Sequence, residues 1–167
     1  MENKVLFRET QKFRSVILWV CFALVIGSLL YRSIQQIVFD IPFGDKPFSD
    51  TGLAMFFIFF GIGFPAFFYF LNLTTEVRND GIYYKFSPMH IKWQRISFEE
   101  IEGCEVKKYR PFREYGGYGI RYTLKGKAYN VSGVMGIQLL LRNGKRVLIG
   151  TQEPDKFMDA INKARAL

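Results

Sequence analysis

TGLAMFFIFFGIGFPAFFYFLNLTT, residues 51–75, runs for 25 positions without a charged side chain and decides the architecture of this 167-residue chain. At about 1.5 Å per helical residue the stretch would reach about 37 Å, more than the hydrocarbon thickness of about 30 Å in a typical bilayer. The sequence therefore predicts a membrane-spanning helix, which we place at residues 51–73.

A second apolar stretch precedes it. Residues 15–31, SVILWVCFALVIGSLLY, are followed by Arg32 and then by further apolar residues up to Phe39. Basic residues come before this stretch, as in a secretory signal peptide, but it is longer than a usual signal core and no Ala-x-Ala pattern follows. We expect a first spanning helix at 15–39, with the stem of Arg32 reaching toward the headgroups. Together the two stretches predict a transmembrane hairpin.

The charges around the two stretches predict its orientation. The connection at 40–50 carries three aspartates with two prolines and a glycine, which predicts a short loop. The flanks at 1–14 and 78–95 are both basic, and basic flanks remain in the cytoplasm. We therefore expect a multi-pass protein of the cell membrane, with the loop outside and both termini cytoplasmic, including a basic N-terminus at 1–14.

Small residues inside the spans suggest how the helices bend and pack. Gly61, Gly63 and Pro65 predict a kink near Ile62, because proline lacks the backbone donor that a helix needs. Ala23 and Gly27 lie one turn apart, and such pairs let two helix backbones approach closely. This pair would serve packing within the hairpin or the formation of a homo-oligomer.

The second half of the chain has a different composition. Residues 1–73 hold 6 Lys or Arg and 5 Asp or Glu, whereas residues 74–167 hold 17 and 10, a balance of +7. Residues 74–167 are enough for one small domain with its own core. We expect that domain on the cytoplasmic side.

Period-two patterning in this half predicts about seven short strands separated by turns. Asn79-Asp80-Gly81 and Arg142-Asn143-Gly144-Lys145 are hairpin signals. From Glu153 onward the period lengthens, and a helix with Thr151 as its cap and Pro154 in its first turn is expected. Its predicted inward residues are Phe157, Ala160, Ile161 and Ala164. The sequence predicts an α+β chain whose strands form a small barrel or sandwich, capped by a C-terminal helix. In the strand at 91–98 we expect Ile91, Trp93 and Ile96 to face inward. The predicted strands are 76–78, 82–86, 91–98, 104–109, 120–124, 128–131, 137–141 and 146–149.

Several segments carry a resemblance to a known family: Asp80-Gly81-Ile82, the ISFEEI sequence at 96–101, the YGGYGIR sequence at 115–121, Ser132-Gly133 with Gly136, and IGTQEP at 149–154. Residues 74–164 resemble the bacterial pleckstrin-homology-like domains that follow pairs of membrane spans in uncharacterised proteins. The resemblance implies a pleckstrin-homology-like fold used as a binding platform. The phosphoinositide-binding motif of eukaryotic relatives is not recognisable here, so no ligand follows from it.

The most distinctive polar stretch is 107–122, which mixes five basic residues with aromatic ones and contains one acid, Glu114. Next to a span, such a stretch suits contact with an anionic leaflet. A solvated loop and a protein or peptide partner are the other interpretations. The candidate contact residues are Lys107, Lys108, Arg110, Arg113, Tyr115, Gly116, Gly117 and Arg121.

Other motifs indicate no further chemistry. Gly116, Gly117 and Gly119 precede a strand and not a helix, so tight turning accounts for them better than phosphate binding does. Glu99, Glu100, Glu102 and Glu105 form an acidic cluster that ordinary solvation explains. Cys21 and Cys104 predict no disulfide, and the single His90 no metal site. We expect no cofactor, and a membrane tether argues against nucleic acid as a partner.

The sequence as a whole predicts a non-enzymatic integral membrane protein. It would display a cytoplasmic domain for binding or assembly at the membrane surface, with anionic lipid headgroups or a membrane protein as partner. An accessory subunit of a membrane transporter or secretion complex is the alternative.

Overall fold

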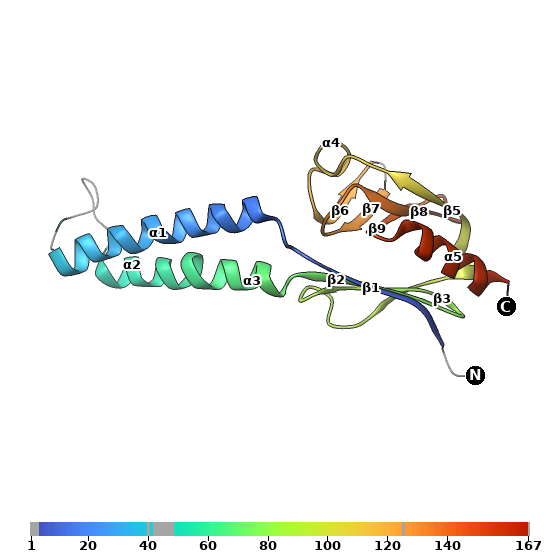
Figure 1. Ribbon diagram of the computed structural model, residues 1–167, viewed down its shortest axis with the longest axis horizontal. Helices are drawn as coiled ribbons and strands as arrows, with labels where there is room; N and C mark the ends of the chain where they lie inside the picture. Colours follow the sequence, from blue (N-terminus) through green and yellow to red (C-terminus); the bar gives the residue numbers. More distant parts are fainter. Residues whose placement is uncertain (1–3, 40, 42–48, 125, 167) are drawn as a thin grey trace. The chain divides into compact units, whose positions relative to one another are not determined.

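The computed structural model describes residues 4–39, 41, 49–124 and 126–166 (Figure 1). The chain divides into two compact units. One is helical and comprises residues 14–70, and the other is β-rich and combines the N-terminal segment up to Phe13 with residues 71–167. Each unit is described by itself below.

The helical unit contains two helices long and apolar enough to cross a membrane. α1 covers Val16–Phe39, and the second helix runs from Asp50 to Phe70 in three segments, α2 (Asp50–Phe56), a π-helical η1 (Phe57–Gly63) and α3 (Phe64–Phe70). The loop predicted at 40–50 falls mainly on 40 and 42–48, outside the described residues.

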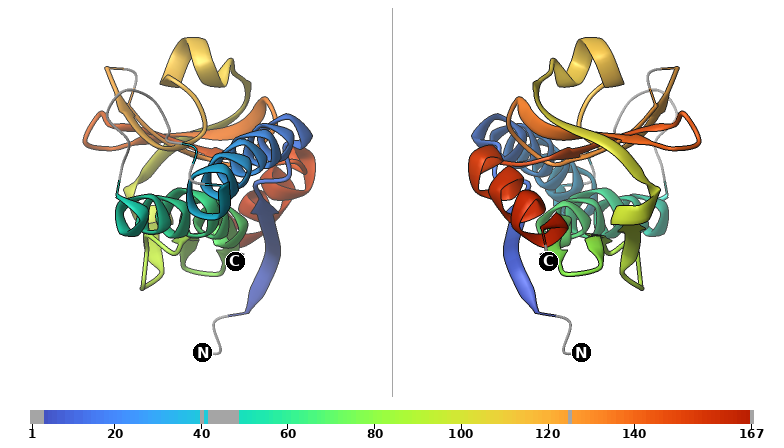
Figure 2. Two further views of the ribbon diagram at one scale, coloured as in Figure 1. Left: turned by 90° about the vertical axis from the view of Figure 1, so that its left-hand side faces the viewer. Right: turned by 90° about the vertical axis from the view of Figure 1, so that its right-hand side faces the viewer.

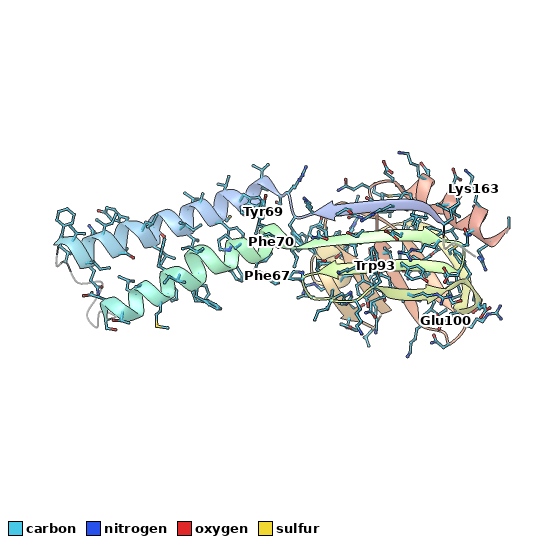
Figure 3. The ribbon with its side chains drawn as sticks, turned by 90° about the horizontal axis from the view of Figure 1, so that it is seen from below. Phe67, Tyr69, Phe70, Trp93, Glu100 and Lys163 are labelled. Carbon is cyan, nitrogen blue, oxygen red and sulfur yellow. The ribbon has the colours of Figure 1, made fainter. Side chains whose placement is uncertain are left out.

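The π-helical segment lies where the sequence predicts a kink. Pro65 has no backbone N–H for the carbonyl four residues earlier, so the regular ladder is interrupted there. The backbone N–H of Phe64 donates instead to the carbonyl of Phe59, five residues before it, which is the π-helical pattern. Phe67, Tyr69 and Phe70 follow near the end of the helix (Figure 3).

The first sheet of the β-rich unit is an antiparallel meander in the order β1-β2-β3-β4. Its strands are β1 (Val5–Lys12), β2 (Asn72–Arg78), β3 (Gly81–Ser87) and β4 (Gln94–Ser97). β1 lies within the segment 1–14, which the sequence analysis describes only as a basic N-terminus and to which it assigns no strand. This strand pairs along its length with β2, with Lys12 opposite Asn72, so the β-rich unit begins before the helices.

The second sheet has the order β5-β8-β9-β7-β6, with β7 and β9 parallel and the other pairs antiparallel. Short helices interrupt the strands, η2 after β4 and α4 after β5, and α5 ends the chain. Among the described residues the two sheets form no closed barrel. The bounds are η2 (Phe98–Glu100), β5 (Ile101–Lys108), α4 (Pro111–Tyr115), β6 (Gly119–Thr123), β7 (Gly126–Asn130), β8 (Met135–Leu141), β9 (Arg146–Gly150) and α5 (Pro154–Arg165).

The core lies between the sheets and α5. All four residues predicted to face inward from this helix, Phe157, Ala160, Ile161 and Ala164, are buried, which confirms that part of the prediction. β1 fastens α5 in place, because the ring of Phe7 stacks on Phe157 at a centroid distance of 5.0 Å. The views along the molecule show α5 running beside β1 (Figure 2).

Two local predictions are wrong. The strand expected at 91–98 is only four residues long, and Ile91 is 86% exposed because it lies in the loop before β4, as does Trp93 (Figure 3). The cap expected at Thr151 is displaced: Glu153 is the N-cap of α5, and the Thr151 hydroxyl accepts the Glu153 N–H instead. The two predicted hairpin turns, after Arg78 and after Leu141, are both present.

Candidate functional site

The stretch singled out in the sequence folds around α4, a short helix between β5 and β6. Arg110 is its N-cap, and its backbone N–H donates to the carboxylate of Glu114 at 2.9 Å. Pro111 occupies the first turn, where its fixed φ suits a helix and no donor is lost. Gly116 ends the helix with φ at 69°, a left-handed conformation that glycine adopts without steric cost.

The underside of α4 is anchored on the second sheet. Tyr109 and Tyr115 are 1% and 2% exposed, their rings meet edge to face at 5.8 Å, and they cluster with Ala128 and Leu148. Burial raises the pKa of Tyr109 to about 12 and also raises the pKa of Tyr115, so both phenols are neutral at physiological pH. Tyr115, predicted as a contact residue, is therefore an anchor beneath the surface.

The outer side of α4 is charged and aromatic. Phe112 is 75% exposed and points its apolar ring into solvent. Lys108, Arg110 and Arg113 are exposed around it. We call Lys108, Arg110, Phe112, Arg113, Tyr118 and Arg121 the basic–aromatic surface.

The remaining predicted residues hold this surface together or lie beside it. Arg121 donates from Nε to the carbonyl of Tyr118 at 2.9 Å and passes close to Gly117, so it braces the glycine turn. Lys107 donates from Nζ to the side-chain oxygen of Gln138 on β8 at 3.3 Å. Gly116 and Gly117 shape the end of α4. The structure thus brings Arg110, Arg113, Gly116, Gly117 and Arg121 together, while Lys107 is engaged by β8.

Tyr118 links the surface to the N-terminal segment. Its ring meets Phe112 edge to face at 5.7 Å and meets Phe13 edge to face at 6.4 Å. Its hydroxyl donates to the carbonyl of Gly133 at 3.1 Å, which fixes the ring. Phe13 stands three residues before Val16, where α1 begins. Sequence reasoning missed Phe13, because nothing local to it indicates a partner more than a hundred residues away.

Ala23 and Gly27 are not used within the hairpin. Both are exposed on α1, and a Cβ added at Gly27 would meet nothing within 4 Å. α1 contacts the second helix through other residues, with Trp19 against Tyr69 at 6.3 Å and Phe22 against Phe68 at 5.4 Å. Of the two roles expected for the small pair, packing inside the hairpin finds no support in this arrangement.

Metal chemistry has no obvious place in the described part of the chain. Its His, Cys, Asp and Glu residues form no group of three or more that could hold an ion. In the acidic cluster, Glu100 accepts the backbone N–H of Ser97 in a capping box at the start of η2. That carboxylate therefore has a structural partner.

Comparison with known proteins gives a family and no function. A sequence model described as a family of unknown function (DUF6141) matches residues 1–167. No curated protein and no solved structure matches the chain.

Proposed function

The chain belongs to DUF6141, a family of unknown function, and from this starting point we propose that it is a non-enzymatic integral membrane protein that displays a domain at the cytoplasmic surface of the cell membrane. The displayed domain is the β-rich unit, which is pleckstrin-homology-like by resemblance. Its basic–aromatic surface contacts anionic lipid headgroups.

The two apolar helices support the membrane anchor. α1 has 24 residues and the second helix 21, or about 36 and 31 Å of helix, enough for a hydrocarbon core of about 30 Å. α1 buries none of its residues in the described chain, although its residues 16–31 carry no charged side chain. A helix that is apolar all round needs a lipid or protein environment.

Pairing of β1 with β2 supports the hairpin topology. Residues 5–12 and 72–78 are hydrogen-bonded neighbours, so both must lie on the same side of the membrane. The chain between them must then cross an even number of times, as two spans do. The basic flanks favour the cytoplasm for that side.

The observation that carries the lipid contact is the edge-to-face packing of Tyr118 on Phe13. Three residues of chain reach about 10 Å at most, so Phe13 cannot lie farther than that from the start of α1. The headgroup region extends about 5–8 Å beyond the hydrocarbon on each side. Tyr118, whose ring lies 6.4 Å from that of Phe13, is thus tethered near the start of α1, and headgroup contact requires that the basic–aromatic surface face the leaflet.

The positive charge of the basic–aromatic surface gives it a preference for anionic lipid. Each Lys or Arg near an anionic leaflet contributes about 1 kcal/mol, so Lys108, Arg110 and Arg113 together would contribute about 3 kcal/mol. Because the domain is already tethered, this energy orients it and is not needed to recruit it. Phe112 and Tyr118 suit the interface, where aromatic rings are favoured.

Hydrogen exchange on the full chain in nanodiscs tests the proposal. We expect the amides of residues 108–121 to exchange more slowly when the discs contain an anionic lipid than when they contain only zwitterionic lipid. Arg110→Glu with Arg113→Glu should abolish this difference. Lys163→Glu on the exposed side of α5 is the matched control and should retain it (Figure 3). Equal exchange in both kinds of disc for the wild-type chain would refute the lipid contact.

A second candidate function, accessory subunit of a transporter or secretion complex, is favoured by the exposure of Ala23 and Gly27. A lipid-facing small pair suits packing against another membrane helix. Cysteine crosslinking at either position, in a Cys21→Ser background, separates the two roles. Crosslinks to a second protein in native membranes would support the subunit, and their absence would support the simple anchor.

A further inference from the structure

The β-rich unit has two open sides between its sheets, and α5 covers one of them. α5 contacts β1 and β2 of the first sheet and β5 and β8 of the second. Its four buried residues, which include Phe157, pack into the core on that side. On the opposite side, between β3–β4 and β6–β7, the described residues form no such helix.

A cleft of about 720 Å³ opens on the unplugged side. Its walls come from β3 and β4, from the end of β6 and the start of β7, and from the turn between β8 and β9. Tyr84, Ile96 and Val147, all less than a tenth exposed, supply apolar surface to this cleft together with Leu141. A volume between about 300 and 1,000 Å³ is typical of small-molecule sites.

Basic side chains dominate the same cleft. Arg95, Lys127, Lys145 and Arg146 are among its lining residues, against one acid, Glu100. In β9 the side chain of Arg146 alternates with that of Val147, so it projects from the opposite face of the sheet. Arg95 is neutralised by Asp80, with a nitrogen to oxygen distance of 3.0 Å. No acidic side chain of the described ranges pairs with the other three cations. The ammonium of Lys127 lies over the ring of Tyr122, 4.9 Å from the ring centroid.

We propose that this cleft binds a small molecule that joins an oxyanion, phosphate or carboxylate, to a flat apolar body. Lys127 and Lys145 receive the oxyanion, because they are the cations on the cleft side whose charge no neighbouring acid offsets. Tyr84, Ile96 and Val147 receive the apolar body. An oxyanion alone would leave the apolar wall uncovered, and an apolar body alone would leave the cations unpaired. The site therefore selects for a ligand that has both groups.

Tyr84 contributes to this selection by staying neutral. Burial raises its pKa well above the ordinary tyrosine value, and the neighbouring Tyr129 raises it further. An ionised phenol at this position would repel an anion. The neutral phenol instead presents an aromatic ring to the apolar body of the ligand.

The cleft is separate from the basic–aromatic surface. Gly119, at the start of β6, follows Tyr118, whereas Thr123 at the other end of this strand lines the cleft. Four strand steps of about 3.3 Å place the two ends about 13 Å apart. Arg121 of the surface and Tyr122 of the cleft are neighbours in this strand, but successive strand residues project from opposite faces of the sheet. The cleft proposal therefore does not depend on lipid contact, and either proposal stands if the other fails.

Three probes test the proposal on the full chain in nanodiscs of zwitterionic lipid. The probes are 2-naphthyl phosphate, which has both parts, 2-naphthol, which lacks the anion, and inorganic phosphate, which lacks the apolar body. Saturation-transfer NMR against empty discs measures binding. We expect saturable binding of 2-naphthyl phosphate, at least about tenfold tighter than that of either partial probe. Equal binding of 2-naphthol would overturn the proposal, as would failure of 2-naphthyl phosphate to bind.

Charge variants locate the binding. Lys145→Glu and Lys127→Glu should each weaken 2-naphthyl phosphate binding about tenfold, because each replaces a favourable charge with a repulsive one. Lys127→Arg should retain binding. Lys163→Glu, which makes the same charge change outside the cleft, should leave it unchanged. Since Lys145 is exposed in a turn, its variant tests the site without disturbing the core. An unchanged affinity for Lys145→Glu together with Lys127→Glu would place the ligand elsewhere and refute the assignment.

Discussion

Phe7 and Phe157, from the first strand and the last helix, stack with their ring planes only 11° apart. Both side chains are buried, Phe157 completely. This contact joins the segment before the two long apolar helices to the C-terminal helix. The integrity of the β-rich unit therefore depends on residues from both sides of the helical unit.

Phe7→Ala should destabilise the β-rich unit by about 3–5 kcal/mol, because it removes a buried ring and leaves a cavity against Phe157. Native-state hydrogen exchange of β1, β2 and α5 measures the loss. Val5→Ala, at an exposed position of the same strand, should change the exchange by less than about 0.5 kcal/mol. Similar effects of the two substitutions would show that the stacking is not a core contact.

A soluble form of the β-rich unit requires its first strand. Because Lys12 lies opposite Asn72 in the register, the helical unit can be replaced by a two-residue hairpin turn that joins Phe13 to Leu71 through Asn-Gly. We expect this protein to be monomeric, with sharp amide NMR signals. A fragment of residues 74–167 should aggregate, since it lacks β1 and the start of β2. A well-folded 74–167 fragment would contradict the role assigned to β1.

Glu9 fastens β1 to the segment before α5. Its carboxylate accepts hydrogen bonds from the hydroxyl of Thr151 and from the backbone N–H of Gln152, the latter at 2.8 Å. A double-mutant cycle with Glu9→Gln and Thr151→Val should give a coupling of about 1–2 kcal/mol in the free energy of unfolding. Glu9→Gln with Lys145→Gln, which lies at the other end of β9 from Thr151, is the control and should be additive.

Alkaline pH should weaken the packing of α4. The pKa of Tyr109 is about 12 in the folded chain and about 10 when unfolded, so the folded state holds the phenolic proton more tightly. This contribution to stability is fully present below about pH 10 and is lost as the pH rises through about 12. Thermal unfolding measured across this range should show a decline that is smaller in Tyr109→Phe. Tyr122→Phe, at an exposed tyrosine, should decline as the wild type does.

Local signals in the sequence predict much of the fold. Asn143-Gly144 and Asn79-Asp80-Gly81 form the hairpin turns that their residue types favour, and α5 buries the face that its period indicates. The two apolar stretches give the two long helices. These features depend on neighbours in sequence, which a single sequence contains.

Features that depend on distant partners could not be predicted. The inward positions of β1 include the polar Glu9 and Gln11, so its sequence lacks the apolar alternation that marks a half-buried strand, and its partner β2 follows some sixty residues later. The apolar side chain of Ile91 predicts a core residue, yet the strand begins after it.

The residues of the candidate site also divide into those that local sequence predicts and those that depend on distant partners. Its basic residues are evident from composition, but the burial of Tyr115 and the contact of Tyr118 with Phe13 follow from tertiary packing. The cleft residues come from three separate parts of the β-rich unit, and no spacing in the sequence connects them.

The pairing of β1 with β2 also sets an order of events during biosynthesis. β1 leaves the ribosome first and has no partner until residues 13–71 have been translated, which at 5–20 residues per second takes about 3–12 seconds. A polypeptide whose second helix failed to return to the starting side could never complete this sheet, and Leu73 and Val77 would remain uncovered for proteases and chaperones to recognise. Strand pairing would thus act as a proofreading step for insertion.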